Sequence, residues 1–186
     1  DPLRRQRQMC IRDSTYAVEN NLAPPAAHQI YYTPESREAE YELLPAGREL
    51  GIGNTIWSPI GEGLLTGKIS RNKKAEPGTR QGEGWPEPYI KDKEMLYNLV
   101  DMLKDITSKH NATVTQVVLA WVRDRPNVDS VIIGARNNEQ WYEDVASYNL
   151  QLTDQDIAQI NDLTAPEALY PLWHRAMNSM ERASDA

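Results

Sequence analysis

Residues 54–68 place the strongest constraint on the fold of this chain, because their sequence predicts a short β-strand that leads into a glycine-rich turn. The strand ends at Pro59, which has no N–H to donate to a neighbouring strand. Three glycines then let the backbone approach a ligand without a Cβ in the way: Gly61, Gly63 and Gly67. Trp57, the glycines and Lys68 together suit a flat ring and a phosphate group bound side by side. The alternative is a strand end followed by a flexible loop.

Two common phosphate-binding motifs do not fit this stretch. A P-loop has a glycine, four further residues and then Gly-Lys-Ser/Thr. Here Glu62 stands at the first glycine position, and Ile69 follows the lysine. The Gly-x-Gly-x-x-Gly dinucleotide fingerprint needs a third glycine where Thr66 stands. The stretch therefore belongs to neither class.

The run from Trp57 to Lys68, Trp-Ser-Pro-Ile-Gly-Glu-Gly-Leu-Leu-Thr-Gly-Lys, resembles a segment of aldo-keto reductases. The resemblance is to aromatic-Ser-Pro-Leu-x-x-Gly-x-Leu-x-Gly-Lys, in the branch with potassium-channel β-subunits and bacterial aryl-alcohol reductases. In that family it closes the seventh strand of a (β/α)8 barrel, stacks its aromatic ring on nicotinamide and covers the pyrophosphate. The resemblance thus implies NADP(H) as cofactor, with these contacts from the stretch: Trp57, Ser58, Ile60, Gly63, Gly67 and Lys68.

A second match lies in the strand-like residues 26–33. Gln29, Tyr32 and Thr33 resemble the family's Gln-x-x-Tyr-Ser, with threonine in place of serine. The family's glutamine holds the nicotinamide carboxamide, so the resemblance gives this role to Gln29. Without the resemblance, a lone glutamine in a strand is more often a surface residue.

A third match follows residues 128–133, a largely apolar run typical of a parallel strand that is covered on its outer face. A turn with Gly and Arg then leads to a helix capped by Asn137 or Asn138, and a helix N-terminus favours anions. The segment resembles the family's Ile-Gly-Ala-x-x-x-x-Gln-x-x-Glu-Asn, which binds the adenosine 2′-phosphate and adenine. The resemblance implies five contacts here: Gly134, Arg136, Gln140, Glu143 and Asp144. The last replaces Asn, and an ionised Asp cannot donate to adenine N7.

The order of elements indicates an α/β fold with a parallel sheet. Strands near residues 27–33, 52–57 and 128–133 are each followed by a helical pattern. The resemblance implies the C-terminal part, about strands six to eight, of a (β/α)8 TIM barrel. The barrel is incomplete in this chain, because 186 residues are fewer than the roughly 250 of a typical barrel.

The first 14 residues differ from the rest. They are rich in arginine without an apolar period and resemble translated adaptor sequence. We therefore treat residues 1–14 as non-native and residues 15–186 as the reductase-like part; the alternative is a basic N-terminal arm.

Further expectations concern single side chains. The polar residues 69–93 correspond to a flap over the cofactor in the family, with Trp85 and Tyr89 as candidates to cover a substrate pocket. We expect Arg37 on a solvated face, and His110 as a cap at the end of the helix over residues 94–110.

Composition excludes several classes of function. The net charge of −7, without basic blocks, argues against nucleic-acid and membrane partners. No apolar run approaches the ~20 residues that span a bilayer, and Cys10 alone can form neither an internal disulfide nor a cysteine-based metal site. The expectation is a cytoplasmic protein.

The resemblance implies reduction of aldehydes or ketones, small-molecule carbonyl substrates, with NADP(H) in a parent enzyme. The family's catalytic Asp, Tyr, Lys and His lie on earlier strands, so this chain carries the cofactor-binding part and no catalytic residue. The alternatives are a non-catalytic nucleotide-binding or interaction module like the channel β-subunits, and a remnant that folds only with a missing half.

Overall fold

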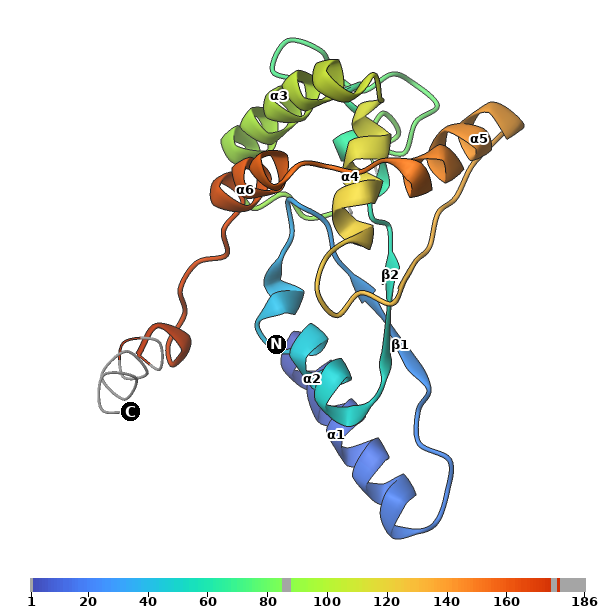
Figure 1. Cartoon of the computed structure of the whole chain (residues 1–186), viewed down its shortest axis with the longest axis vertical. Coiled ribbons are helices and arrows are strands. Elements are labelled where there is room, and N and C mark those ends of the chain that lie inside the picture. Colours follow the sequence, from blue (N-terminus) through green and yellow to red (C-terminus); the bar gives the residue numbers. More distant parts are fainter. Residues whose placement is uncertain (1, 85–87, 175–176, 178–186) are drawn as a thin grey trace.

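Three short parallel strands form one sheet. In the view of Figure 1, α3, α4, α5 and α6 lie in the upper half of the molecule, and α1 and α2 lie in the lower half. The computed structural model describes residues 2–84, 88–174 and 177. The α-helices and strands in chain order are α1 (Pro2–Glu19), β1 (Ala27–Tyr31), α2 (Leu43–Leu50), β2 (Gly53–Trp57), α3 (Lys93–His110), α4 (Val114–Arg123), β3 (Ser130–Val131), α5 (Asn138–Ala146) and α6 (Asp154–Leu163). Short 3₁₀ segments are η1 (Glu38–Glu40), η2 (Gly61–Thr66) and η3 (Ser147–Asn149).

The strands pair in the order β1-β2-β3, and both pairings are parallel. This confirms the predicted α/β architecture with a parallel sheet. The two faces of the sheet differ, because side chains alternate along each strand. Ile30 and Ile56, which are register partners, are buried under the helices, whereas Gln29 on the opposite face is exposed. The described strands therefore form an open sheet with one covered face.

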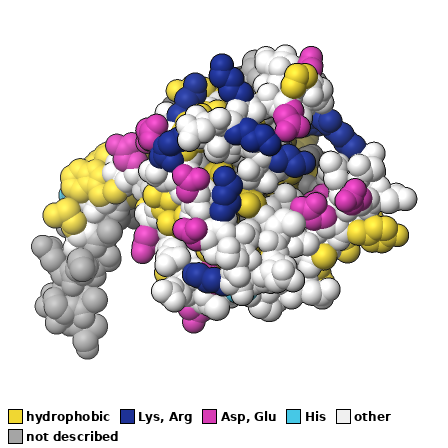
Figure 2. Space-filling model, turned by 90° about the horizontal axis from the view of Figure 1, so that it is seen from above, with side chains coloured by type: hydrophobic (Ala, Val, Ile, Leu, Met, Phe, Trp, Pro, Cys, Tyr) yellow, Lys and Arg dark blue, Asp and Glu magenta, His cyan; other side chains and the backbone are white. Residues whose placement is uncertain are grey.

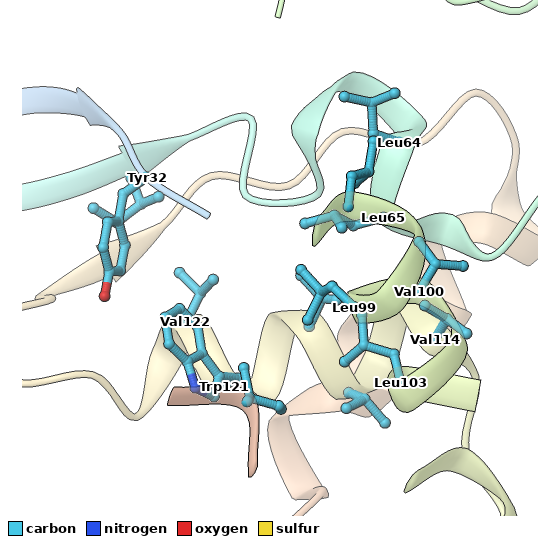
Figure 3. Packing of buried hydrophobic residues seen from close by; sticks show 14 of the residues in the cluster. Tyr32, Leu64, Leu65, Leu99, Val100, Leu103, Val114, Trp121 and Val122 are labelled. Atoms are coloured by element: carbon cyan, nitrogen blue, oxygen red, sulfur yellow. The ribbon is translucent and has the colours of Figure 1, made fainter. Parts of the chain in front are cut away.

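The core lies between α3, α4 and η2 (Figure 3). Leu99 and Leu103 of α3 are fully buried and face Val122 and Trp121 of α4. Leu65 of η2 closes the same cluster, so the turn after β2 is anchored by apolar packing. Helix α4 is apolar nearly all round and is buried along most of its length, as its sequence predicts.

Helix ends agree with the expected capping chemistry. Thr113 and Gln116 form a capping box at α4, and Thr153 and Asp156 form one at α6. Gly51 ends α2 in the left-handed region, with φ 67°. Each of these three helix ends is thus fixed by residues within a few positions of it.

The third strand is much shorter than predicted. The sequence favours a strand over residues 128–133, but only Ser130 and Val131 pair with β2. Ile132 still donates its N–H to the Ile56 carbonyl at 2.8 Å, yet its side chain is 44% exposed. The prediction of a buried strand was wrong here because β3 has a described neighbour on one edge only and lies at the rim of the sheet.

Two single-residue predictions were also wrong. Arg37 does not lie on a solvated face; it is 7% exposed and donates two hydrogen bonds to the Glu40 carboxylate, at 2.8 and 3.0 Å. Its Nη1 also donates to Thr164 Oγ1, which ties the segment after β1 to α6. His110 does not cap α3; its Nε2 lies 2.7 Å from Asp156 Oδ2 and links α3 to α6. Periodicity on one element cannot reveal such partners on another.

The arginine-rich start of the chain belongs to a helix. Helix α1 runs continuously from Pro2 to Glu19 and packs against α2, so residues 1–14 are not separated from residues 15–19 by a break. The non-native origin of residues 1–14 stays a prediction.

Apolar side chains gather on two outer surfaces. Figure 2 shows hydrophobic side chains at both sides of the molecule, over the C-terminal tail on the left and over α5 on the right. On α5, Trp141 and Tyr142 are 47% and 71% exposed.

Among the described residues, no helix is long and apolar enough to cross a membrane.

Candidate functional site

A groove of about 620 Å³ lies at the C-terminal ends of β2 and β3. This volume falls within the range of about 300–1,000 Å³ that is usual for small-molecule sites. Ten of the twelve residues predicted to bind the cofactor line it: Trp57, Ser58, Ile60, Gly63, Lys68, Gly134, Arg136, Gln140, Glu143 and Asp144. Gln29 and Gly67 do not line it. Parallel strands expose their carboxyl ends at one edge, which is why residues some 80 positions apart in the chain meet there.

The first wall is the turn between β2 and η2. Ser58, Gly61, Glu62 and Gly63 all adopt positive φ, so the chain coils tightly and turns its backbone toward the groove. A Cβ on Gly63 would meet nothing within 4 Å, which leaves this backbone open to a ligand.

Gly67 has a structural role in this turn. A Cβ there would lie 2.9 Å from Val114 Cγ2, and φ is 74°. The glycine therefore lets η2 pack against α4, and it supports the groove from behind.

Trp57 stands at the end of β2 and is held from the side by Tyr31 of β1. The two ring centroids lie 4.9 Å apart at an angle of 49°. The Tyr31 hydroxyl is buried and has no hydrogen-bond partner among the described residues. Gln29 lies on the same face of the sheet as Tyr31, two residues nearer the start of β1. Gln29 therefore lies on the open sheet face, outside the lining of the groove.

The second wall is the turn from β3 into α5. Asn137 caps α5 by accepting the N–H of Gln140 at 2.9 Å, which decides between the two candidate caps. The Gln140 side chain accepts the N–H of Arg136 at 2.9 Å and so fixes the turn before the helix. At the first helical turns, free N–H groups and the helix dipole favour an anion.

Two further residues of α5, Glu143 and Asp144, line the groove and carry carboxylates. Gln116 of α4 donates to the Glu143 carbonyl at 3.0 Å, which holds α5 against α4. Asp144 is 8% exposed. Burial, and then the neighbouring Glu143 carboxylate, raise the pKa of Asp144.

The third wall lies within the predicted flap (residues 69–93), but the side chains that form it were not among the predicted site residues. It comes from the strap (residues 70–84), of which five residues line the groove: Ala75, Glu76, Thr79, Arg80 and Gln81. Arg136 Nη1 donates to the Gly78 carbonyl at 3.0 Å, and Arg80 Nη1 lies 3.1 Å from Glu62 Oε1. The strap is polar and lacks a period, so its sequence gives no signal for which of its side chains face the groove.

The two aromatic candidates in the flap have different outcomes. Trp85 lies outside the described residues. Tyr89 is 82% exposed and does not line the groove, so it does not cover it.

The walls of the groove carry charges of both signs, and the carboxylates among them are Glu62, Glu76, Glu143 and Asp144. Lys68, Arg80 and Arg136 bring three cations to its walls, and Trp57 supplies an aromatic surface at one end. None of the described residues that line the groove is a tyrosine or a histidine. Within the described ranges, no three His, Cys, Asp or Glu side chains are placed to hold a metal ion.

The family model for the Aldo/keto reductase family matches residues 8–165. Among curated proteins, the chain is 31% identical to NADH-specific methylglyoxal reductase of Escherichia coli over 138 residues, 73% of this chain and 40% of the relative. It is 30% identical to a putative voltage-gated potassium channel subunit beta of Schizosaccharomyces pombe over 154 residues, 79% of this chain and 44% of the relative.

An aryl-alcohol dehydrogenase of Pestalotiopsis microspora is 30% identical over 146 residues, 78% of this chain and 35% of the relative. The chain spans less than half the length of these relatives. They include the two classes of protein named by the resemblance, which is confirmed. Because the family model covers most of its length, this chain belongs to the aldo/keto reductase family.

Proposed function

We propose that this chain is the nicotinamide-nucleotide-binding part of a carbonyl reductase and corresponds to about strands six to eight of the family's barrel. The nucleotide is NADP(H), and the substrate of the whole protein is a small aldehyde or ketone. The observation that carries the proposal is the meeting of ten predicted cofactor residues around one groove.

The walls of the groove suit the parts of the nucleotide. Trp57 offers its indole to the nicotinamide, with Tyr31 behind it. Lys68 and the backbone at Gly63 take the pyrophosphate, and Arg136 takes the 2′-phosphate at the start of α5. When bound, the nucleotide supplies the hydride, and the chain's own residues orient it and shield it from water.

The same arrangement argues for a non-catalytic fragment. Reduction of a carbonyl needs an acid beside the oxygen, and the family's tyrosine and histidine have no counterpart among the described groove residues. We therefore infer that the catalytic tetrad belongs to segments that this chain does not contain, and that the isolated chain binds nucleotide without reducing a carbonyl.

Binding and turnover are tested on the same purified chain. Titration calorimetry with NADPH should give a saturable heat, and incubation with NADPH and a panel of aldehydes, including 4-nitrobenzaldehyde, should give no turnover above a protein-free control. Absence of NADPH binding by a folded sample would refute the nucleotide-site proposal. Turnover in preparations free of host reductases would refute the proposed inactivity.

A second candidate function is a non-catalytic nucleotide-binding or interaction module. Its support is the similarity to proteins named as potassium channel β-subunits in Schizosaccharomyces pombe and Arabidopsis thaliana. The genomic sequence upstream of the codon for residue 15 distinguishes the two candidate functions. A reading frame that encodes the tetrad favours the reductase, and its absence in genomic sequence favours the module.

A further inference from the structure

The strap is tied to both of the other walls of the groove. On the β3–α5 side, Arg136 Nη1 donates to the Gly78 carbonyl at 3.0 Å. On the η2 side, Arg80 Nη1 lies 3.1 Å from Glu62 Oε1. Both contacts use a guanidinium that lines the groove. Two of the cations that would meet a phosphate are thus engaged by acceptors of the protein itself.

Glu62 is an unusual partner for such a contact. Its side chain is only 9% exposed, and its backbone has φ 53°, a region that non-glycine residues seldom adopt. Its second oxygen, Oε2, is buried and accepts no hydrogen bond from any described residue. A buried carboxylate oxygen without a donor is costly. Packing and backbone preference therefore give no reason for a carboxylate at this position.

The position of Glu62 suggests what the carboxylate does. It lines the groove in the turn where the proposed function places the pyrophosphate, and it presents one anionic oxygen to Arg80. A phosphate carries more acceptor oxygens than a carboxylate, and both groups make charge-assisted hydrogen bonds to guanidinium groups. The carboxylate and a ligand phosphate would compete for the same guanidinium.

We propose that Glu62 stands in for a ligand phosphate: it holds Arg80, and with it the strap, against the η2 wall until a phosphate-bearing ligand takes its place. This inference rests on the proposed nucleotide function. It makes Glu62 a specificity-determining residue that lowers the affinity for anionic ligands, because each phosphate must displace a resident carboxylate and then lie near it. Ligands without a phosphate do not meet this competition.

The test compares Glu62→Gln with the wild-type chain. Glutamine keeps the size of the side chain and removes its charge. Calorimetry should show NADPH and inorganic pyrophosphate binding about fivefold tighter to the variant, about 1 kcal/mol at 1.4 kcal/mol per tenfold. Nicotinamide riboside, which has no phosphate, should bind equally to both. Glu49→Gln, an exposed change on α2, is the matched control and should alter nothing.

A second readout needs no nucleotide. Trypsin cleavage after Lys74 or Arg80 in the strap should be severalfold faster in Glu62→Gln than in wild type, and added pyrophosphate should slow it in both. Circular dichroism and tryptophan fluorescence establish that the variant is folded. In an Arg80→Gln background, Glu62→Gln should improve pyrophosphate binding less than it does in the wild-type background, because the competition for Arg80 is gone and only the repulsion between carboxylate and phosphate remains.

The outcomes separate the two proposals. If NADPH binds but Glu62→Gln leaves phosphate binding unchanged or weakens it, Glu62 orients Arg80 or does nothing, and this inference is wrong while the nucleotide site stands. If pyrophosphate binds with the expected gain but NADPH does not, the nucleotide proposal fails and the competition holds. If neither ligand binds the folded wild-type chain, both are refuted.

Discussion

Asp156 should be the most sensitive single charge for the stability of this chain. It is fully buried, and it accepts hydrogen bonds from Lys109 Nζ at 2.9 Å, His110 Nε2 at 2.7 Å and Thr153 Oγ1 at 2.6 Å. These contacts join the start of α6 to the end of α3. Asp156→Asn keeps the shape of the side chain and removes the charge that all three donors face.

The expected loss follows from the exposure of the partners. A hydrogen bond to a charged group contributes about 1.5–3 kcal/mol when it is buried. The Lys109 side chain is 49% exposed, so its pair contributes about 1 kcal/mol at most. The His110 side chain is only 15% exposed, so its hydrogen bond to Asp156 contributes more to stability than that of Lys109. We expect Asp156→Asn to lower the free energy of unfolding by about 2–4 kcal/mol at pH 7.

The pH dependence has a definite sign. Burial by itself raises the pKa of Asp156, but the hydrogen bonds from Thr153, His110 and Lys109 outweigh it and hold the pKa below its usual range. A depressed folded-state pKa stabilises the protein above the unfolded-state value of about 3.9 and loses this contribution as the pH falls below it. The difference between wild type and variant should therefore narrow from pH 7 to pH 3.

Urea unfolding followed by tryptophan fluorescence at pH 7, 5 and 3 measures this difference. Asp154→Asn is the control, since Asp154 is exposed in the first turn of the same helix and should contribute about 0.3–1 kcal/mol. A cost of Asp156→Asn no greater than that of Asp154→Asn, or a difference that stays constant down to pH 3, would refute the reasoning.

Three further predictions concern the groove and the open sheet. Arg136→Ala in a full-length version should weaken NADPH by about tenfold or more and NADH much less, because a charge-assisted pair contributes about 1.5–3 kcal/mol; equal losses in calorimetry would show that Arg136 does not read the 2′-phosphate. Gly67→Ala should lower the free energy of unfolding, measured in urea, by about 2–3 kcal/mol, and Gly51→Ala should lower it by only about 1 kcal/mol. Both glycines have positive φ, but only a Cβ at Gly67 would meet Val114. Equal losses for the two variants would contradict this reasoning. The chain should self-associate, because β1 and β3 are the edge strands of the described sheet. Size-exclusion chromatography with light scattering measures this, and a monodisperse monomer with a cooperative unfolding transition would contradict the prediction.

Local patterns in the sequence predicted the elements that depend on local physics. The apolar period of α3 and the caps at Thr113 and Thr153 act within a few residues, so they are readable without a structure. The third strand is different. Its apolar run over residues 128–133 predicts burial, but burial depends on neighbours on both edges, and Ile132 lies at the rim of the sheet.

The groove likewise has walls that local sequence motifs predict and one wall that depends on tertiary contacts. The walls that carry Trp57 and Arg136 follow from motifs in which spacing and residue type are both informative. The strap contributes Arg80 through a tertiary contact to Glu62, and a polar loop carries no period that could predict it. Arg37 was placed on the surface for the same reason, since its partners Glu40 and Thr164 come together only in the folded chain.

The location of nucleotide binding tests the central claim most directly. Hydrogen–deuterium exchange of the chain with and without saturating NADPH measures protection along the backbone. The proposal predicts that protection rises over residues 57–68 and 133–144, which form the two predicted walls, and leaves α1 and α6 unchanged. Protection confined to segments outside these walls, or no change at saturating NADPH, would contradict the assignment of the groove as the nucleotide site.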